Sequence, residues 1–504
     1  MASAQNHVQY SSKIGIIGAG ISGIATAKQL RHYDPLVFEA TNSIGGVWKH
    51  CSFNSTKLQT PRCDFQFSDY PWPERDDASF PSHVELLDYL HGYAVHFDVL
   101  KYIKFNSKVV EIRHLGDRDT ARVSDTAGEY GSLLKGHPVW EVAVETNQAI
   151  QWYGFELLVM CIGKFGDIPR MPTFPANKGE EIFGGKVLHS MDYSKLDKEA
   201  ATELLQGKKV AIIGYRKSAI DLAVECAEAN QGYGDCPFSY FIQQGFSISP
   251  SEAKLRLPQD LPLFHIITHG KFKRKAISKF IESYLVWKLP LVKFGLKPDH
   301  PFEEDYASCQ MAILPENFFS EAEKGNILFK RAPKWWFWSG GIEFEDKSKL
   351  EADVVLLATG YDGKKKLQSI LPKPFSSLLA DSSGIMPLYR GTIHPLIPNM
   401  AFVGYIETVS NLQTAEIRCK WLARLADQKF KLPAVEKMLE QTTKEVEIMK
   451  QTTRFFKRHC ISTFSINHSD EICEEMGWKS WRKNNWISEA FRPYSSQDYQ
   501  EAKY

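Results

Sequence analysis

Three glycines and a glutamate near the N-terminus have the types and spacing that hold a dinucleotide. Gly18, Gly20 and Gly23 form a G-x-G-x-x-G turn directly after the apolar run Ile14–Ile17, and Glu39 follows the next apolar run. In such a turn the first glycine permits a tight bend, the second lets the backbone approach a pyrophosphate, and the third lets helix and strand pack closely. A carboxylate at the position of Glu39 accepts hydrogen bonds from ribose hydroxyls. The pattern predicts a site for the ADP half of a flavin.

A glycine pair that follows the first turn adds residues to the predicted flavin site. Gly45-Gly46-Val47-Trp48 begins six residues after Glu39. The pair again allows close backbone approach, and the tryptophan can form a wall of the cofactor pocket; the alternative is a glycine turn beside a core tryptophan. The helix after the first turn would present unpaired N–H groups to the phosphates. The residues predicted to bind the flavin are Gly18, Ala19, Gly20, Ile21, Ser22, Gly23, Glu39, Gly46, Val47 and Trp48.

A second unit of the same kind begins at Lys208. The apolar run Val210–Ile213 enters a turn and then a helix that runs toward Ala229, and the apolar run 238–242 follows at the distance expected for the next strand. Two adjacent dinucleotide sites imply two cofactors, one that keeps a redox centre and one that delivers hydride. The residues predicted to bind the second dinucleotide are Gly214, Tyr215, Arg216, Lys217, Ser218 and Ala219.

This order predicts an α/β fold in which one dinucleotide-binding, Rossmann-like domain is nested inside another. Residues 1–175 would form the first part of the outer domain, residues 176–349 the inner domain with an irregular insert at 247–333, and residues 350–504 the completion of the outer domain with a helical C-terminal tail. The 504 residues exceed one typical core, which agrees with such a division.

The connections between the domains can also be predicted. The apolar runs Val354–Leu357 and 400–405 are the candidates for the strands that return to the first domain. The proline-rich stretch 168–175 and the region around Gly360 are expected to be the two crossings, because proline fixes φ and removes a donor.

Composition and residue spacing argue against several classes of protein and of site. A net charge of +1 argues against a nucleic-acid binder. Nine cysteines without a C-x-x-C pair predict free thiols in a reducing compartment and not a disulfide framework. No signal peptide is indicated and no run of about 18 apolar residues exists, so a cytoplasmic location without a spanning helix is expected. No His/Cys cluster has metal-ligand spacing, so no metal is expected.

Two further helices are predicted outside the nucleotide units. Apolar residues at helical spacing between Ile277 and Leu285, stopped by Pro290, follow a cluster of basic residues. They indicate an amphipathic helix packed on the nucleotide domain; a lid or a helix in peripheral contact with a membrane surface is the alternative. A long charged helix is expected from 434 to 459, and the aromatic-rich end is expected to wrap back over the first domain.

The chain resembles the flavin-containing monooxygenases over nearly its whole length. The segment from Phe183 to Tyr193 matches the identifying motif F-x-G-x-x-x-H-x-x-x-Y at every fixed position, and Phe67-Ser-Asp-Tyr-Pro71 is similar to the F-S-D-x-P segment of the family. Ala358-Thr-Gly360-Tyr361 is similar to its A-T-G-Y signature, which adds Gly360 to the predicted cofactor-binding residues. The plant-type members, particularly the branch of pathogen-induced amine N-hydroxylases, resemble it most.

The resemblance implies two cofactors and a reaction. In the family NADPH reduces FAD, dioxygen adds at the flavin 4a carbon, and the resulting flavin hydroperoxide passes one oxygen atom to a soft nucleophile. Many members place an asparagine near the flavin, and the aligned residue here is Gln59. Because glutamine keeps an amide on a longer arm, Gln59 is the candidate catalytic residue; the alternative is that it only lines the pocket.

Two departures concern the nicotinamide coenzyme. Arg216 replaces the middle glycine of the second turn, and Gln244 stands where the family usually has an arginine that holds the 2′-phosphate of NADP. Either Arg216 supplies the phosphate contact, or the preference for NADPH over NADH is weak, or the flavin chemistry has diverged.

The prediction is an NADPH-dependent N- or S-monooxygenase that acts with dioxygen on a small soft nucleophile, first an amine or amino-acid-derived nitrogen. The alternatives are an S-oxygenase, a flavin oxidase or oxidative decarboxylase of the auxin-forming kind, and a catalytically idle flavoprotein module.

Overall fold

Short apolar strands assemble into two parallel sheets in the computed structural model. The structure describes residues 8–9, 12–73, 79–116, 128–230, 239–243, 271–380, 384–491 and 494–500. In a parallel sheet the central strands are covered on both faces, so they are apolar throughout. Every residue of β2 (Ile14–Ile17), β8 (Leu157–Met160), β10 (Val210–Ile213) and β16 (Val354–Leu357) is buried.

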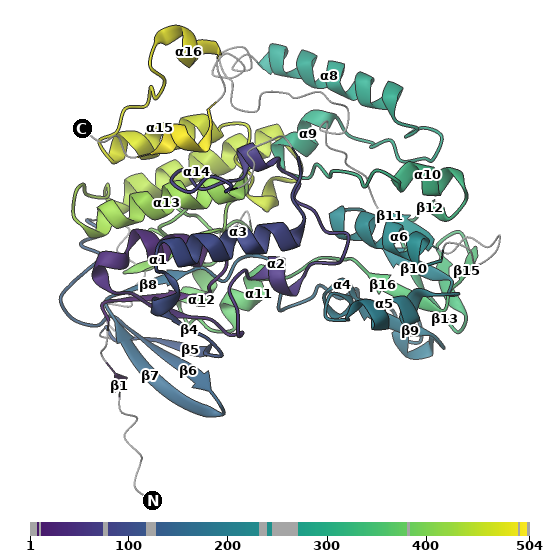
Figure 1. Ribbon diagram of the computed structural model, residues 1–504, viewed down its shortest axis with the longest axis horizontal. Coiled ribbons are helices and arrows are strands. Elements are labelled where there is room, and N and C mark those ends of the chain that lie inside the picture. Colours follow the sequence, from purple (N-terminus) through teal and green to yellow (C-terminus); the bar gives the residue numbers. More distant parts are fainter. Residues whose placement is uncertain are drawn as a thin grey trace, which may run out of the picture.

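The first sheet has the strand order β17-β8-β2-β3-β4, and all neighbouring strands are parallel. It adds β3 (Leu36–Phe38), β4 (Ile103–Lys104) and β17 (Met400–Phe402) to the strands above. The second sheet has the order β12-β11-β10-β16-β9, again all parallel, with β9 (Lys186–His189), β11 (Ser239–Gln243) and β12 (Ile327–Arg331). The two sheets occupy opposite halves of the molecule (Figure 1).

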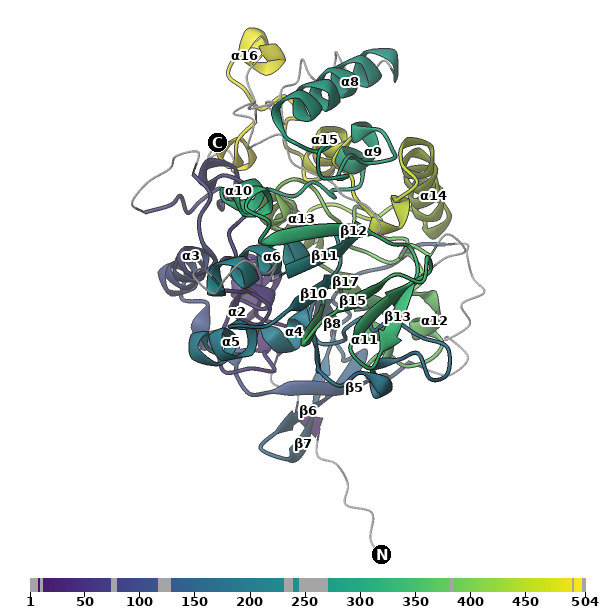
Figure 2. The same ribbon diagram turned by 90° about the vertical axis from the view of Figure 1, so that its right-hand side faces the viewer.

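Two smaller sheets flank these layers. Strands β5 (Lys108–His114), β6 (Trp140–Thr146) and β7 (Ala149–Phe155) form an antiparallel sheet with the short β1 (Val8–Gln9) at its edge. Strands β13 (Trp335–Trp338), β14 (Gly341–Phe344) and β15 (Lys349–Glu351) form a meander beside the second sheet. Figure 2 shows the meander next to β12 and β10.

The helices cover the sheets in an order set by the nesting. The described α-helices are α1 (Ile21–Gln29), α2 (Val47–His50), α3 (His83–His96), α4 (Ser190–Tyr193), α5 (Lys198–Leu205), α6 (Lys217–Ala229), α8 (Lys271–Lys288), α9 (Phe302–Ala307), α10 (Phe318–Glu323), α11 (Gly363–Gln368), α12 (Phe375–Leu378), α13 (Asn411–Ala426), α14 (Val435–Thr452), α15 (Ser465–Glu475) and α16 (Trp486–Phe491). None of these is both long and apolar enough to cross a membrane.

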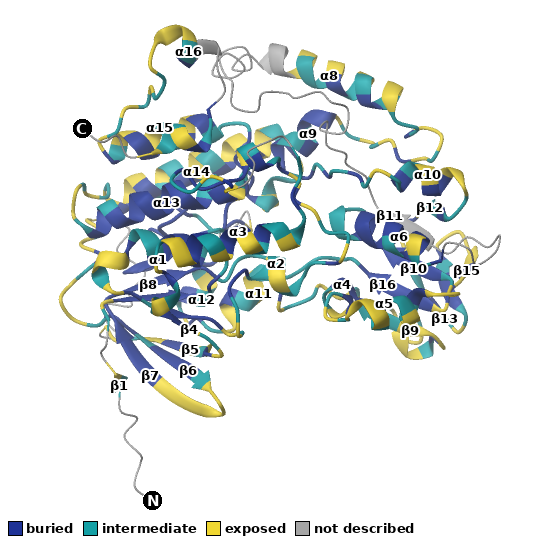
Figure 3. Cartoon of the chain, viewed as in Figure 1, coloured by how far each residue is buried: buried dark blue, intermediate teal, exposed yellow. Residues whose placement is uncertain are grey.

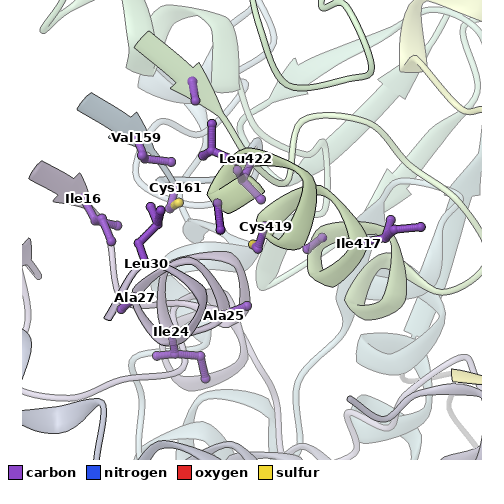
Figure 4. Close-up of a cluster of buried hydrophobic side chains, with 14 of the residues drawn as sticks. Ile16, Ile24, Ala25, Ala27, Leu30, Val159, Cys161, Ile417, Cys419 and Leu422 are labelled. Atoms are coloured by element: carbon purple, nitrogen blue, oxygen red, sulfur yellow. The ribbon is translucent and has the colours of Figure 1, made fainter. Parts of the chain in front are cut away.

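The first core is built where α1 lies between the first sheet and α13. Side chains from both helices and the sheet meet there (Figure 4), and most of α13 is buried (Figure 3). The hydroxyl of Thr26 on α1 lies 3.6 Å from the sulfur of Cys161 and 3.3 Å from that of Cys419. This packing fixes the start of α1, and therefore the glycine turn, against the carboxyl ends of the strands.

The nested fold class is confirmed, but one of its predicted strands was assigned to the wrong sheet. Val354–Leu357 does not return to the first sheet: β16 lies between β10 and β9 of the second. A fully apolar run fits the centre of any parallel sheet, so its pattern did not say which one. Met400–Phe402 does return to the first sheet, beside β8. We therefore propose that the inner domain extends through Leu357, beyond the expected boundary at 349.

The two predicted crossings lie side by side. Pro169 and Tyr361 form an antiparallel bridge, and the Arg170 N–H donates to the carbonyl of Gly360 (2.8 Å). The outgoing and returning chains therefore pair with each other where the two sheets are joined.

The amphipathic helix is present as α8 and is packed, as expected, with α9 as its main partner. Ile281 and Leu285 are buried against Phe302, whereas Phe280 and Trp287 are exposed on the outer face. The side chains of 271–274 and residues 244–270 lie outside what the structure describes, so most of the predicted basic cluster and Gln244 are not placed.

The C-terminal region also differs in detail from expectation. The long helix α14 ends at Thr452, seven residues before the predicted end at 459. The aromatic end does return to the first domain, since Trp478 and Tyr499 pack on its core.

Free thiols were expected throughout, and this prediction is wrong for one pair. Cys309 and Cys460 form a disulfide across a sequence separation of 151 residues. The two cysteines are far apart in the chain and are brought together only by the packing of α9 on the C-terminal region, so their spacing carried no signal. The other described cysteines, which are Cys51, Cys63, Cys161, Cys226, Cys419 and Cys473, form no disulfide.

Candidate active site

The turn after β2 leaves room for a ligand at one glycine and none at another. Gly18 has φ of +100°, and a Cβ on Gly23 would lie only 1.9 Å from the carbonyl oxygen of Gly18. A Cβ on Gly20 would meet only Gly46, at 3.8 Å from its Cα. The turn therefore needs Gly18 and Gly23 for its own shape, while the space above Gly20 is kept free by the protein.

Both helix starts that face this space lack a side-chain cap. Gly20 caps α1 and Gly46 caps α2 without any side-chain hydrogen bond. The Gly45 N–H donates to the Ala19 carbonyl (3.2 Å), which ties the second glycine pair to the first turn. The nine-residue α1 thus directs unpaired N–H groups and its positive dipole end into the space beside Gly20.

Glu39 lies at the end of β3, where a ribose would lie, and is almost fully buried. Its Oε2 accepts from the Ala19 N–H at 2.7 Å, and its Oε1 accepts from the N–H and the hydroxyl of Thr41 at 3.0 and 2.8 Å. These donors fix the carboxylate, and Oε2 keeps a further lone pair for a sugar hydroxyl. Thr41 was not predicted; its position two residues after the acid was the only signal.

The second turn, after β10, repeats this design with substitutions. A Cβ on Gly214 would lie 2.7 Å from the Ala358 carbonyl and 3.0 Å from the Cβ of Ala219. Arg216 is the N-cap of the 13-residue α6 and makes no side-chain cap bond, so the first N–H groups of α6 are free to meet phosphate.

The guanidinium of Arg216 is bonded to Gln310 and lies beside the ring of Tyr215. Its Nη2 donates to Oε1 of Gln310 at 2.5 Å, and its guanidinium carbon lies 5.1 Å from the ring centre of Tyr215. The Nε is buried without a hydrogen-bond partner among the described residues. Burial, and then the charge of Arg458, lower the pKa of Arg216. A donor that is buried and unsatisfied is unfavourable unless an acceptor arrives, so this side chain fits a bound phosphate.

The remaining predicted residues of the second turn have other surroundings. The ammonium of Lys217 is paired with Asp221 at 2.6 Å, so its charge is directed into the helix and not toward the turn. Ala219 is fully buried against Gly214. Gly360 has φ of +83°, and a Cβ at this position would meet no described atom within 4 Å, which leaves open space at the crossing.

Gln59 lies at the border between the first domain and the insert. Its side chain is exposed, and its Oε1 accepts from the Ile313 N–H at 3.3 Å. The next residue, Thr60, donates its hydroxyl to the Val409 carbonyl (2.8 Å) and fixes the segment to the chain that follows β17. Beside it lies a pocket with a polar lining, which includes Asp64, Tyr306, Thr408, Ser410 and Ser465.

A buried charged network, which sequence reasoning missed, lies beyond the carboxyl ends of β8 and β17. Glu407 is 6% exposed and pairs with Lys164 (2.7 Å) and Arg458 (2.6 Å). Burial opposes ionisation, but the two cations outweigh it and hold the pKa of Glu407 below its usual value. Ligands of such sheets bind outside the carboxyl ends of the strands, so the position of Lys164 just after β8 was the available signal.

The F-x-G-x-x-x-H-x-x-x-Y segment connects the domains and contributes no obvious reactive group. The hydroxyl of Tyr193 donates to Glu225 (2.9 Å), which also accepts from the N–H and hydroxyl of Ser55 (2.9 and 2.8 Å). His189 accepts from the Met191 N–H at 3.1 Å, and burial lowers its pKa. No group of three or more His, Cys, Asp or Glu side chains within the described ranges could hold a metal ion.

Comparisons with known proteins agree with this geometry. The model of the flavin-binding monooxygenase-like family matches residues 11–483. A protein of Arabidopsis thaliana described as a probable flavin-containing monooxygenase 1 is 57% identical, with 97% of this chain and 96% of that protein covered. Human flavin-containing monooxygenase 5 is 26% identical over 92% of this chain and 83% of its own.

Solved structures show the same fold at low sequence identity. The structure of OTEMO with FAD and NADP has a TM-score of 0.64 at 19% identity, covering 90% of this chain and 93% of that one. The open structure of cyclohexanone monooxygenase has a TM-score of 0.65 at 15% identity, covering 92% and 98%. The S-allyl-L-cysteine S-oxygenase of Allium sativum has a TM-score of 0.56 at 20% identity, covering 92% and 88%.

Proposed function

Because the chain belongs to the flavin-binding monooxygenase-like family, we propose that it uses FAD and NADPH to transfer one oxygen atom from dioxygen to the nitrogen of a small amine or amino-acid-derived substrate. The predicted resemblance to plant-type flavin-containing monooxygenases is confirmed by the 57% identity with the Arabidopsis protein. The more specific resemblance to amine N-hydroxylases remains a prediction.

The observation that carries the proposal is the pair of uncapped helix starts, one in each domain. The start of α1 faces the space between Gly20 and Gly46, and the start of α6 carries the half-satisfied guanidinium of Arg216. Each offers backbone N–H groups to a pyrophosphate. The crossings at Pro169 and Tyr361 form an antiparallel bridge where the chain passes between the two domains, so the two sites lie on either side of this connection.

The residues would divide the work between binding and positioning. The FAD would be held by the α1 turn, Gly46 and Glu39, and the nicotinamide dinucleotide by the α6 turn and Arg216. When bound, the flavin supplies electron transfer from the nicotinamide and activation of dioxygen. Gln59 would offer an amide that can both donate and accept beside the flavin, and the Glu407 network would hold the neighbouring backbone in place through its two ion pairs and the hydrogen bond from Lys164 to the Arg458 carbonyl.

Two finer points remain proposals. Arg216 would serve as the 2′-phosphate contact that favours NADPH over NADH, since a guanidinium can pair bidentately with phosphate. A cytoplasmic location is consistent with the free thiols, and a cytosolic disulfide would then be of the transient, redox-linked kind.

The test measures three quantities: the rate of NADPH oxidation, the yield of oxygenated product and the yield of hydrogen peroxide. Each is measured with an amine substrate, with a thioether substrate and without substrate. Nitrogen oxygenation coupled to NADPH use supports the proposal. Oxygenation of the thioether alone identifies an S-oxygenase, peroxide or decarboxylation without oxygenated product identifies an oxidase, and no NADPH use identifies an idle flavoprotein.

Replacement of Gln59 tests its assigned role in the same assay. In Gln59→Leu the side chain loses its polar group beside the flavin, so we expect FAD content and NADPH oxidation to persist while product per NADPH falls and hydrogen peroxide rises. Gln59→Asn, which restores the amide on a shorter arm, is the control and should recover part of the coupling. Equal coupling in the wild type and Gln59→Leu would remove Gln59 from the mechanism.

A further inference from the structure

One short loop of the insert contacts both residues assigned to cofactor chemistry. Gln310 accepts from the guanidinium of Arg216 at 2.5 Å, and the N–H of Ile313 donates to Gln59 at 3.3 Å. The loop 308–313 has no regular secondary structure, so its position depends on what holds its ends. A movement of this loop would alter the nicotinamide site and the flavin site together.

The disulfide holds this loop at its first turn. Cys309 is bonded to Cys460, which belongs to the C-terminal segment that runs beside the Glu407 network. The same segment reinforces the link: Arg458 Nε donates to the Ser308 carbonyl (2.9 Å), and the Ser462 hydroxyl donates to the Tyr306 carbonyl (2.6 Å). The covalent bond and these two hydrogen bonds act on the same four-residue stretch.

The backbone at Cys309 shows that this position is imposed by its surroundings. Cys309 has φ of +52°, a left-handed conformation that is unfavourable for a residue with a Cβ. Such a conformation persists only where neighbouring contacts determine it. The disulfide is the covalent one among the contacts that hold Cys309 in it, together with the hydrogen bond from Arg458 to the neighbouring Ser308 carbonyl.

The two cysteine residues differ in exposure, which favours attack at Cys309. Cys309 is partly exposed, whereas Cys460 is 2% exposed. A dithiol reductant would attack the Cys309 sulfur as a thiolate, break the sulfur–sulfur bond and release Cys460 as a thiolate, which then takes up a proton. The second thiol of the reductant resolves the mixed disulfide, so the reductant leaves as a disulfide and both cysteines become thiols.

We propose that Cys309–Cys460 is a redox-responsive site whose reduction by a dithiol releases the loop 308–313 from Arg216 and Gln59 and weakens NADPH binding. The inference rests on the proposed function for the roles of those two residues. In the oxidised protein Gln310 holds Arg216 while its Nε has no hydrogen-bond partner among the described residues, so the guanidinium is preorganised for phosphate. Loss of that preorganisation raises the dissociation constant of NADPH about threefold to tenfold, the size of one hydrogen bond.

The experiment uses the FAD-loaded protein before and after treatment with dithiothreitol, removed without exposure to air. Thiol alkylation with peptide mapping reports the state of Cys309 and Cys460, and calorimetric titration gives the NADPH dissociation constant. Limited trypsin digestion within residues 454–458 reports whether this segment, which holds the loop through the bond from Arg458 to Ser308, loosens when the loop is released. We expect reduction to raise the dissociation constant threefold to tenfold and to accelerate cleavage in that segment.

Variants separate this site from other thiols. The double variant Cys309→Ser/Cys460→Ser should show the dissociation constant of the reduced protein with and without dithiothreitol, whereas Cys63→Ser, which changes a partly exposed cysteine outside the disulfide, should respond as the wild type does. If the double variant does not fold, the reversible response of the wild type on reoxidation replaces it.

The outcomes distinguish two failures. The redox proposal is overturned, and the proposed function left intact, by either of two results. One is an unchanged dissociation constant with unchanged cleavage in protein whose Cys309 and Cys460 are shown to be reduced. The other is a protein that never forms the bond. Absence of NADPH binding in both states overturns the proposed function, while faster cleavage on reduction would still support release of the loop.

Discussion

A side chain at Gly20 and a side chain at Gly23 would meet very different surroundings, although both glycines belong to one turn. A Cβ at Gly23 would collide with the backbone of Gly18, whereas one at Gly20 would meet only the opposite glycine at ordinary contact distance. Gly20 also has φ of −73°, which any residue adopts. The fold therefore requires Gly23, whereas no described contact of the fold requires glycine at position 20.

This difference gives a paired prediction. Gly20→Val should remain folded, but its affinity for FAD should fall at least about tenfold, which corresponds to roughly 1.4 kcal/mol or more of binding free energy. Gly23→Ala should instead lower stability or soluble yield, because its Cβ lies 1.9 Å from a carbonyl oxygen. Flavin absorbance per protein and circular dichroism separate the two effects. Normal flavin content in Gly20→Val would refute the placement of the pyrophosphate.

Arg216 gives a second prediction at this scale. The Nε of Arg216 lacks a partner among the described residues. Arg216→Ala should therefore raise the dissociation constant of NADPH roughly tenfold or more relative to that of NADH, as expected for a charge-assisted contact of about 1.5–3 kcal/mol. Dissociation constants of both coenzymes measure this, and Lys217→Ala, whose charge is already paired with Asp221, is the control. An equal loss for both coenzymes would assign Arg216 to the pyrophosphate or to the fold.

At the scale of elements, the glycine turns, their strands and their helices could be predicted because each depends on a local pattern. The apolar runs of β2, β3 and β10 and the start of α6 lie where the sequence indicated. The prediction of which sheet a strand joins was wrong for β16. This strand is apolar throughout, and nothing in its sequence distinguishes the second sheet from the first.

The segment between α12 and β17 contains an element whose stability depends on pH. His394 is fully buried; its Nε2 pairs with the Leu378 carbonyl (3.0 Å), and its Nδ1 accepts from the Leu396 N–H (3.1 Å). These partners require the neutral ring, and burial lowers the pKa of His394 to about 4 from the ordinary 6.5. A proton on Nδ1 would face the Leu396 donor.

The consequence is a loss of stability in acid. The unfolded chain binds the proton at higher pH than the folded one. The contribution of His394 to the free energy of unfolding is therefore complete above pH 6.5, and about 3 kcal/mol of it is lost as pH falls toward 4. Denaturant unfolding of the wild type and of His394→Gln between pH 7 and pH 4.5 measures it. The variant should be less stable at pH 7 and should lack this part of the pH dependence; parallel curves for the two proteins would contradict the assignment.

At the scale of the whole molecule, the candidate site is made by contacts that no local pattern encodes. Gln59, Arg216, Gln310 and Cys460 come from four distant parts of the chain and meet only after the insert and the C-terminal region fold over the two sheets. The sequence could therefore indicate single residues such as Gln59 and Arg216 through their alignment, but not the loop that joins them. The Glu407 network was missed for the same reason, since its three members are 51 to 294 residues apart.

Glu225 of α6 offers a test of how the two domains are positioned. It accepts hydrogen bonds from Ser55 of the first domain and from Tyr193 of the second. Glu225→Leu leaves the Ser55 N–H without its acceptor, which should cost about 1–3 kcal/mol of stability. It should also slow reduction of the flavin by saturating NADPH, because hydride transfer depends on the alignment of the two cofactors.

A neighbour on the same helix provides the matched control. Glu228 accepts only from Asn317 within the insert (2.7 Å) among the described residues, so Glu228→Leu should leave the rate of flavin reduction unchanged. Thermal unfolding and anaerobic stopped-flow absorbance measure the two effects, and Glu225→Gln, which keeps the Oε1 acceptor, should recover most of both. If Glu225→Leu loses stability but reduces its flavin at the wild-type rate, the tie between Ser55 and α6 serves the fold alone, and the alignment of the cofactors must depend on the paired crossings at Pro169 and Tyr361.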